Sequence, residues 1–355
     1  MRRRTPTMNR CAEVLTRCQR LMVLLVIGLM GMLSLTFNWR RSHLGHFLAT
    51  RRMALRRAMI TLAHLSDVHL APLPPVRARD LMNKRITGFL NWKIKREHTM
   101  AGDGLTKLVR HMREQNPDFT VVTGDLVNLA LDAEINTAHN WLETLGPPEQ
   151  VCISPGNHDA YLKGQLQKAM DRWDGYVMGE TVDDNAFPFV RRVGDVAVVS
   201  CNSAVPTAPW IAAGRFEQDQ AARLARCLKL LGDGGYFRVV LIHHPPNQEQ
   251  AHPRLGLYGA KSFRRVIAEH GAELVLHGHT HQSSIYAIPG PRGDVPVVGV
   301  AAAGAAQGDT GGHDPARYNL FSIQRLGTAW QCTLREFGFQ RLSTDIVLRL
   351  SLRIY

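Results

Sequence analysis

Aspartate, histidine and asparagine residues gather in five short clusters along the chain, and all three residue types can bind metal ions. Carboxylate, imidazole and amide oxygen together suit Mn²⁺, iron or Zn²⁺, whereas the absence of cysteine from the clusters argues against a structural zinc site. Seven ligands drawn from these clusters would be too many for one ion with an open position, but they would suffice for two ions that share a bridging carboxylate. Two ions about 3.5–4 Å apart can clamp a phosphoryl group and turn a bridging water into hydroxide. The clusters are Asp67-Val68-His69, Gly124-Asp125, Pro155-Gly156-Asn157-His158-Asp159, His243-His244-Pro245 and His277-Gly278-His279-Thr280-His281.

Each cluster directly follows, or overlaps the end of, a short apolar run that predicts a buried β-strand. The carboxyl ends of strands in an open α/β sheet border a common crevice where ligands bind. A single Asp-x-His sequence would most simply be a turn or a helix cap, but turn chemistry alone does not account for five strand ends of the same character. We therefore expect one shared site at the ends of strands 60–66, 119–123, 151–154, 237–242 and 274–276.

Stretches with the apolar spacing of helices separate these strands, at 105–112, 135–145, 224–231 and 263–267. Alternating strands and helices predict a largely parallel sheet that is covered on both faces. After about residue 283 the pattern becomes rich in strands, which suggests a second sheet packed on the first. The Gly/Ala-rich residues 301–312 are expected to form a flexible loop.

Several other kinds of site are excluded by missing motifs. The sequence has no G-x-S-x-G elbow, no G-x-x-x-x-G-K-[ST] phosphate loop and no H-x-H-x-D-H metal motif. The six cysteines form no C-x-x-C pair, and buried thiols are the simplest interpretation of those in apolar runs.

The net charge of +13 comes almost entirely from the first 59 residues, which hold twelve arginines against Glu13 alone. The remaining residues, 60–355, carry a charge of only about +2 by difference. A basic patch that would bind nucleic acid is therefore not indicated for the catalytic body.

Residues 21–37 form an uncharged apolar run whose 17 residues lie at the lower limit of a membrane-spanning helix. No small-x-small cleavage site follows, which favours an uncleaved anchor over a signal peptide. Arginines on both sides leave the orientation open. In the alternative interpretation, translation starts near Met59 and the upstream segment is not part of the protein. The protein is then expected to be membrane-associated if residues 1–59 are genuine, and cytoplasmic otherwise.

In order and wording, the five clusters resemble the motifs of the calcineurin-like metallophosphoesterase superfamily, which run D-x-H, G-D, G-N-H-[DE], H and G-H-x-H. The resemblance covers about residues 60–325 and implies a four-layer α/β/β/α sandwich with two divalent ions, Mn, Fe or Zn. Three regions are thus expected: the extension 1–59, the phosphoesterase domain 60–325, and a C-terminal strand and tail at 326–355.

The resemblance also implies a role for each matching residue. Asp125 would bridge the two ions, and His158 would stabilise the transferring phosphoryl charge or protonate the leaving oxygen. Asp159 would orient His158. The first ion would be bound by Asp67, His69 and His281, and the second by Asn157, His243 and His279.

Some choices within the motifs rest on finer features. His243 is preferred to His244 because His243-His244-Pro245 satisfies the family's H-x-P form. His277 is expected behind the ligands, and His64 in the core. Asn128 departs from the protein phosphatases, whose G-D motif continues to a second Asp and Arg-Gly, so the closer likeness is to bacterial cyclic-nucleotide phosphodiesterases and glycerophosphodiesterases.

The segment 72–96 is a basic amphipathic insertion between the first ligand pair and the first clear helix. It is interpreted either as a cap whose apolar face packs on the domain, or as a lid that attracts anionic substrate or rests on a membrane. Asn202-Ser203 is a further candidate wall of the pocket.

The leading hypothesis is a two-metal hydrolase that cleaves a phosphodiester or pyrophosphate bond in a small or lipid-linked substrate by means of a metal-bridging hydroxide. The alternatives are a catalytically silent scaffold with the same fold and a nuclease of the superfamily. The sequence leaves the oligomeric state undetermined.

Overall fold

The computed structural model describes residues 59–96, 103–247, 254–305, 314–340 and 344–355. The chain divides into two units, Met1–Ala58 and Met59–Tyr355. The apolar run at 21–37 lies outside the described residues, so the anchor expected there stays a prediction. Within the described ranges, no helix has the length and apolar character needed to cross a membrane.

Two six-stranded sheets form the centre of the described unit. The first contains β1 (Met59–Leu65), β2 (Phe119–Val122), β3 (Val151–Ile153), β12 (Arg317–Leu326), β13 (Ala329–Phe339) and β14 (Ile346–Arg353). Their spatial order is β14-β13-β12-β1-β2-β3. β1, β2 and β3 run parallel, and the three late strands extend the sheet antiparallel from the other side of β1.

The second sheet contains β4 (Phe189–Val193), β5 (Val196–Ser200), β7 (Phe237–Leu241), β9 (Leu274–His277), β10 (Ser284–Ile288) and β11 (Val295–Gly299). Its order is β10-β11-β9-β7-β5-β4, with a parallel centre of β5, β7, β9 and β11. A separate two-stranded pairing joins β6 (Gly214–Arg215) to β8 (Leu257–Tyr258).

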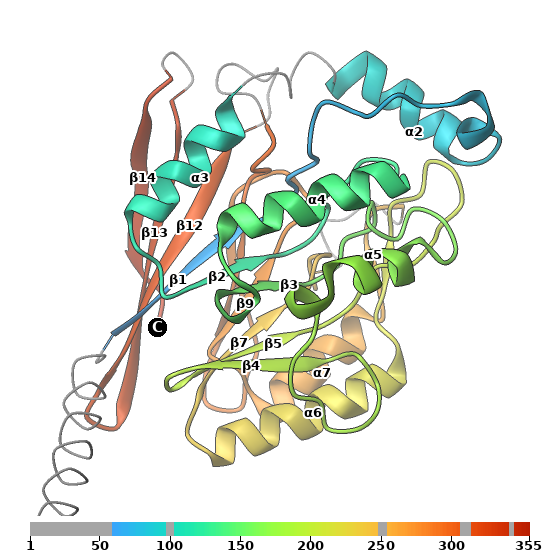
Figure 1. Ribbon diagram of the computed structural model, residues 1–355. Helices are drawn as coiled ribbons and strands as arrows, with labels where there is room; N and C mark the ends of the chain where they lie inside the picture. Colours follow the sequence, from blue (N-terminus) through green and yellow to red (C-terminus); the bar gives the residue numbers. More distant parts are fainter. Residues whose placement is uncertain (1–58, 97–102, 248–253, 306–313, 341–343) are drawn as a thin grey trace, which may run out of the picture. The chain divides into compact units, whose positions relative to one another are not determined.

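Successive strand residues point to opposite faces of a sheet, and the apolar residues follow this alternation. In β7, Val239 and Leu241 join the core between the sheets, whereas Val240 belongs to the core under the outer helices. The expected α/β/β/α layering is therefore confirmed (Figure 1). The helices over the first sheet are α3 (Gly104–Glu114), α4 (Asp132–Leu145) and α5 (Gln165–Trp173), and those over the second are α6 (Gln218–Asp233) and α7 (Ala260–His270).

The distribution of strands between the sheets differs from the sequence-based expectation. β7 and β9 were expected beside β1, β2 and β3, with the strands after residue 283 forming a sheet of their own. Instead β7 and β9 lie in the second sheet, and β12, β13 and β14 join the first. A single sheet covered on both faces does not form, because each sheet packs one face against helices and the other face against the second sheet.

The tail from residue 326 and the insertion at 72–96, both distinguished in the sequence, form regular secondary structure. From residue 326 the chain forms the hairpin of β13 and β14, which pairs with β12 rather than standing alone. The insertion at 72–96 contains the turn η1 (Ala78–Leu81), the helix α2 (Arg85–Asn91) and the π-helical turn η2 (Trp92–Arg96). Within residues 301–312, the described part at 301–305 contacts the first cluster: Ala303 and Gly304 donate backbone hydrogen bonds to Ser66 and Asp67.

Candidate metal centre

The loops that follow β1, β2, β3, β7 and β9 converge where the carboxyl ends of the two sheets meet. Their backbone is strained in an unusual way. Five of the seven expected ligands adopt positive φ angles, which non-glycine residues rarely do and which concentrate at functional sites. They are Asp67 (50°), His69 (43°), Asp125 (57°), His279 (70°) and His281 (55°).

One glycine is essential to this convergence. A Cβ atom on Gly156 would lie 2.2 Å from Asp125 Oδ1 and 2.5 Å from the Asp125 amide nitrogen, far inside van der Waals contact. Only glycine therefore lets the loop after β3 approach the loop after β2 this closely.

The first set of donors consists of the residues expected to bind the first ion. His281 Nε2 lies 3.2 Å from Asp67 Oδ1 and 3.4 Å from His69 Nε2. Asp67 is fully buried, and among the described residues no group donates a hydrogen bond to its Oδ1, whereas its Oδ2 accepts one from the His279 amide at 2.9 Å. A buried carboxylate oxygen without a donor is costly unless a cation binds it.

The second set adjoins the first. Asn157 Oδ1 lies 3.1 Å from His243 Nε2 and 3.0 Å from His279 Nδ1. Asp125 lies between the sets: its Oδ2 is 3.3 Å from His243 Nε2 and 3.8 Å from His69 Nε2. The structure thus brings all seven expected ligands together in two groups that share one carboxylate.

The outer nitrogens of three of these histidines contact backbone carbonyls. Those carbonyls belong to Val127 for His69 Nδ1, Thr123 for His243 Nδ1 and Leu255 for His279 Nε2. Because a carbonyl only accepts, each outer nitrogen carries a proton, and each inner nitrogen, once deprotonated, directs its lone pair to the centre. Lone pairs and carboxylates facing one another are the arrangement that a pair of metal ions requires, so the residues present fit such ions.

The electrostatics agree with this arrangement. Burial alone would lower the pKa of His243, but the carboxylates of Asp125 and Asp67 raise it to about 9. The centre therefore attracts positive charge, which either a proton or a metal ion can supply.

His158 lies beside the centre rather than in either donor set. Its backbone amide donates to Asp125 Oδ1 at 2.7 Å, and its Nδ1 donates to the carbonyl of Asn128 at 2.6 Å. Its ring meets the His69 ring edge-on, with centroids 4.7 Å apart.

The expected role of Asp159 in orienting His158 stays a prediction, and the contacts of Asp159 show a different role. Its buried carboxylate accepts hydrogen bonds from the backbone amides of Asp125, Leu126, Val127 and Gly156 at 2.8–3.4 Å. Burial and then the charge of Asp125 raise the pKa of Asp159 to about 7. Asp159 therefore fixes the loop after β2 to the loop after β3, and the carbonyl of Asn128 orients His158.

The remaining histidines take positions behind the ligands. His244 is bound at both ring nitrogens, by Ser203 Oγ at 2.8 Å and the Ala212 carbonyl at 3.1 Å, so the geometry favours His243 as the ligand. His277 Nδ1 contacts the Gly278 carbonyl, and buried His64 contacts Thr123 Oγ1 at 2.9 Å.

A cavity of about 580 Å³ opens next to the centre, with Asn157 and His158 among its lining residues. Its other walls include residues that the motifs did not indicate. Lys84 comes from the basic insertion, Tyr161 follows the third cluster, and Trp210 comes from the loop after Asn202-Ser203. Asn202 itself turns away, since its backbone and side chain bond Gln220 and Ala204.

A clamp that no sequence motif indicates holds the loop that carries Asn128. The buried Glu134 carboxylate accepts from the amides of Asn128, Leu129 and Leu131. Arg85 of α2 donates to the carbonyls of Leu129 and Ala130 at 2.8 and 2.6 Å. The insertion is thus fixed to the same loop that orients His158.

Comparison with known proteins supports what the motifs indicate. Residues 60–283 match the family model described as calcineurin-like phosphoesterase. The chain belongs to this family. The resemblance seen in the sequence motifs is thereby confirmed, and the region from residue 284 to 325 lies beyond the match.

Individual relatives are more distant. A probable cyclic nucleotide phosphodiesterase of Synechococcus sp. is 28% identical over 181 residues, which is 49% of this chain and 62% of that protein. Among solved structures, a dimetal phosphatase from Danio rerio aligns with a TM-score of 0.53 at 12% identity, covering 83% of this chain and 98% of that one. At this identity the second match supports a common fold only.

Proposed function

We propose that this calcineurin-like phosphoesterase is a two-metal-dependent hydrolase that cleaves a phosphodiester or pyrophosphate bond. The observation that carries the proposal is the position of Asp125, whose carboxylate faces His69 on one side and His243 on the other. A carboxylate shared between two complete donor sets is the arrangement expected of a bridged pair of ions. When bound, two divalent cations would polarise the phosphoryl group and make water nucleophilic at neutral pH.

The residues of the chain would supply the remaining steps. Water oxygen forms a bond to phosphorus while the bond from phosphorus to the leaving oxygen breaks. His158 lines the cavity and is fixed through Nδ1; when Nε2 is protonated as well, the imidazolium would donate that second proton to the departing oxygen.

Two features favour diesters or pyrophosphates over protein phosphomonoesters. The G-D motif continues to Asn128 and lacks the second Asp and Arg-Gly of protein phosphatases. The relative from Synechococcus sp. is named a probable phosphodiesterase. Contact with a membrane through 21–37 or 72–96 stays a prediction, although Met82, Ile86, Leu90 and Ile94 of the insertion are exposed.

The test compares hydrolysis of bis(p-nitrophenyl) phosphate with that of p-nitrophenyl phosphate after loading with Mn²⁺, Fe²⁺ or Zn²⁺. We expect faster cleavage of the diester, and a loss of about 100-fold or more in Asp125→Asn together with a lower metal content. Asp132→Asn, an exposed carboxylate at the start of α4, is the control and should retain activity. Two bound ions without any turnover would contradict the proposal and favour a silent scaffold.

A further inference from the structure

The cavity beside the metal centre contains a half-buried cation whose charge no carboxylate neutralises. Lys84 Nζ donates to Thr207 Oγ1 at 2.8 Å and lies 3.5 Å from the Ile211 carbonyl. It also stands 4.6 Å above the centre of the Tyr161 ring. Among the described residues, no Asp or Glu oxygen lies within ion-pair distance of it, so every contact is with a neutral group.

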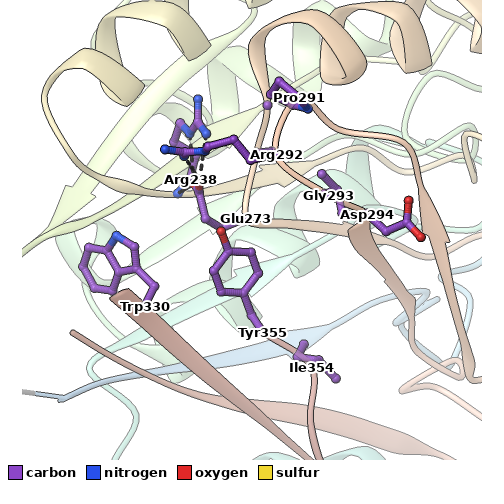
Figure 2. Close-up of a pocket in the computed structure, with 12 residues that line it drawn as sticks. Arg238, Glu273, Pro291, Arg292, Gly293, Asp294, Trp330, Ile354 and Tyr355 are labelled. Carbon is purple, nitrogen blue, oxygen red and sulfur yellow. Dashed lines mark hydrogen bonds and ion pairs between the residues drawn. The ribbon is translucent and has the colours of Figure 1, made fainter. Parts of the chain in front are cut away.

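The other buried cations of the described unit lie close to carboxylates. Arg85, next in sequence to Lys84, has the charges of Glu134, Asp80 and Asp132 nearby. A second cavity, of about 280 Å³, lies at the amino ends of β7 and β9, on the edge opposite the metal centre. Figure 2 shows its two arginines gathered around one carboxylate: Arg238 pairs with Glu273 at 2.7 Å and Arg292 with the same group at 3.5 Å.

This contrast separates a structural ion pair from a binding site. In the second cavity the buried Arg238 is paired with Glu273, and Arg292, which shares that carboxylate, is 77% exposed and therefore hydrated. Burial lowers the pKa of Lys84, because its ammonium group is partly removed from water. Among the described residues no carboxylate compensates this desolvation cost. An anion supplied by a ligand would offset that cost.

The position of Lys84 relative to the reacting centre is also defined. One aromatic ring separates it from His158, because the Tyr161 ring lies 5.6 Å from the His158 ring and under the ammonium group. Gly88 of α2 allows this approach, since a Cβ there would come within 2.1 Å of the Tyr161 hydroxyl. The contacts to Thr207 and Ile211 hold the amine in place before a ligand arrives.

The cavity also has apolar lining residues that suit an uncharged organic group. Trp210 is 76% exposed and adopts a positive φ of 61°, which is a strained conformation for a bulky residue. Leu90 and Leu255 line the same cavity and are about half exposed. Asn157 and His158 of the centre, the Lys84 amine and these apolar side chains thus line one cavity.

We propose that Lys84 binds a second phosphoryl group adjacent to the scissile one, so that the preferred substrate is a pyrophosphate diester with an organic group directed toward Trp210. This inference rests on the proposed hydrolase function and specifies its substrate class. Hydrolysis adds one water, breaks the P–O–P linkage and yields two monoesters, so no further reactant is required. Lys84 is a specificity-determining residue, and it takes no part in bond cleavage.

The kinetic test uses the full chain loaded with Mn²⁺ and two substrates, UDP-glucose as a pyrophosphate diester and bis(p-nitrophenyl) phosphate as a diester with one charge. We expect Lys84→Met to lower kcat/KM for UDP-glucose about 10-fold or more, mainly through KM, because a charge-assisted contact is lost. The other substrate should change by less than about twofold, and Lys84→Arg should retain most of the preference. Lys93→Met, a lysine of the same insertion that does not line the cavity, is the matched control.

A binding measurement separates failure of this inference from failure of the proposed function. Calorimetry compares methylenediphosphonate, a non-hydrolysable pyrophosphate analogue, with inorganic phosphate on the wild type and Lys84→Met. A selective loss of diphosphonate affinity supports the subsite even if the wild type turns over neither substrate. Equal loss for both substrates and both anions, or no loss in either assay, overturns it. Melting temperature and metal content of each variant show whether the fold and the centre are intact.

Discussion

At the scale of single residues, His158 differs from the expected ligands because its ring lies at the border of the cavity, with the carbonyl of Asn128 accepting from Nδ1. With Nδ1 donating to the carbonyl of Asn128, Nε2 is the atom that can exchange a proton at the cavity. A leaving group with a high pKa requires that proton, whereas p-nitrophenolate departs readily without it. The dependence on leaving group therefore reports the role of His158.

We expect His158→Ala to lower kcat for diphenyl phosphate by about 100-fold or more, and for bis(p-nitrophenyl) phosphate by clearly less. Metal content should stay unchanged, because His158 belongs to neither donor set. Steady-state kinetics and elemental analysis check both points. Equal losses for the two esters would assign His158 to charge stabilisation instead of proton transfer.

At the scale of elements, the side chain of Arg85 couples the insertion at 72–96 to the loop that orients His158. Arg85 donates two hydrogen bonds to the carbonyls of Leu129 and Ala130, and it is itself buried. Removing it leaves those acceptors without their donor and frees α2 from the loop that orients His158.

We expect Arg85→Met to lower the free energy of unfolding by about 2 kcal/mol, because charged hydrogen bonds to buried carbonyls are lost. Turnover should fall as well, with both metal ions retained. Chemical denaturation and kinetics measure the two effects. Arg79→Met, an exposed arginine of the same insertion, serves as the control, and a similar loss in that variant would show that the insertion is not clamped at Arg85.

A second element-scale device joins β7 to the start of β9. Arg238 and Glu273 are both about 3% exposed, and the guanidinium group contacts the carboxylate at 2.7 and 2.9 Å. The same arginine also donates to the carbonyls of Leu228 and His270. Two adjacent parallel strands and two helix ends thus share one buried charge pair.

We expect Glu273→Gln to cost about 3–5 kcal/mol of stability, because it leaves the charge of Arg238 buried and unpaired. Urea denaturation measures this cost. Asp233→Asn breaks the exposed pair with Lys229 and should change stability little. The double variant Arg238→Met/Glu273→Leu should recover much of the lost stability. If it recovers none, the ion pair stabilises the fold by more than the cost of burying its two charges.

At the scale of the whole unit, the metal centre links the two sheets. The loops of the first sheet provide Asp67, His69, Asp125 and Asn157, whereas the loops of the second provide His243, His279 and His281. Metal ions that bind only the folded chain therefore stabilise the packing of one sheet on the other.

We expect removal of the ions with a chelator to abolish activity reversibly and to lower stability by about 3 kcal/mol for each ion, relative to protein held at 100 times the dissociation constant. Differential scanning calorimetry with and without chelator measures the shift. In Asp125→Asn the chelator should have a much smaller effect on melting temperature. An unchanged melting temperature in the wild type would show that the sheets are joined without metal.

Much of the candidate site follows from the sequence because its residues lie directly after strands. Asp67, Asp125 and Asn157 follow runs that bury themselves whatever the topology, and strand ends border a common crevice in α/β folds. The helices at 105–112 and 135–145 likewise follow from apolar spacing, since amphipathic periodicity is a local property. The five clusters and the helices needed no long-range information, whereas the role of each ligand and the four-layer order came from the resemblance to the family.

Tertiary structure alone decided how those parts combine. Apolar strands such as β7 and β12 carry no mark of their sheet, because either position buries them equally well. The hydrogen bonds of Asp159 to a loop more than thirty residues earlier, and the contact of Lys84 with Tyr161 and Thr207, depend on segments that are distant in sequence. Local patterns specify what a residue can do, but its partner is determined only when the whole chain is packed.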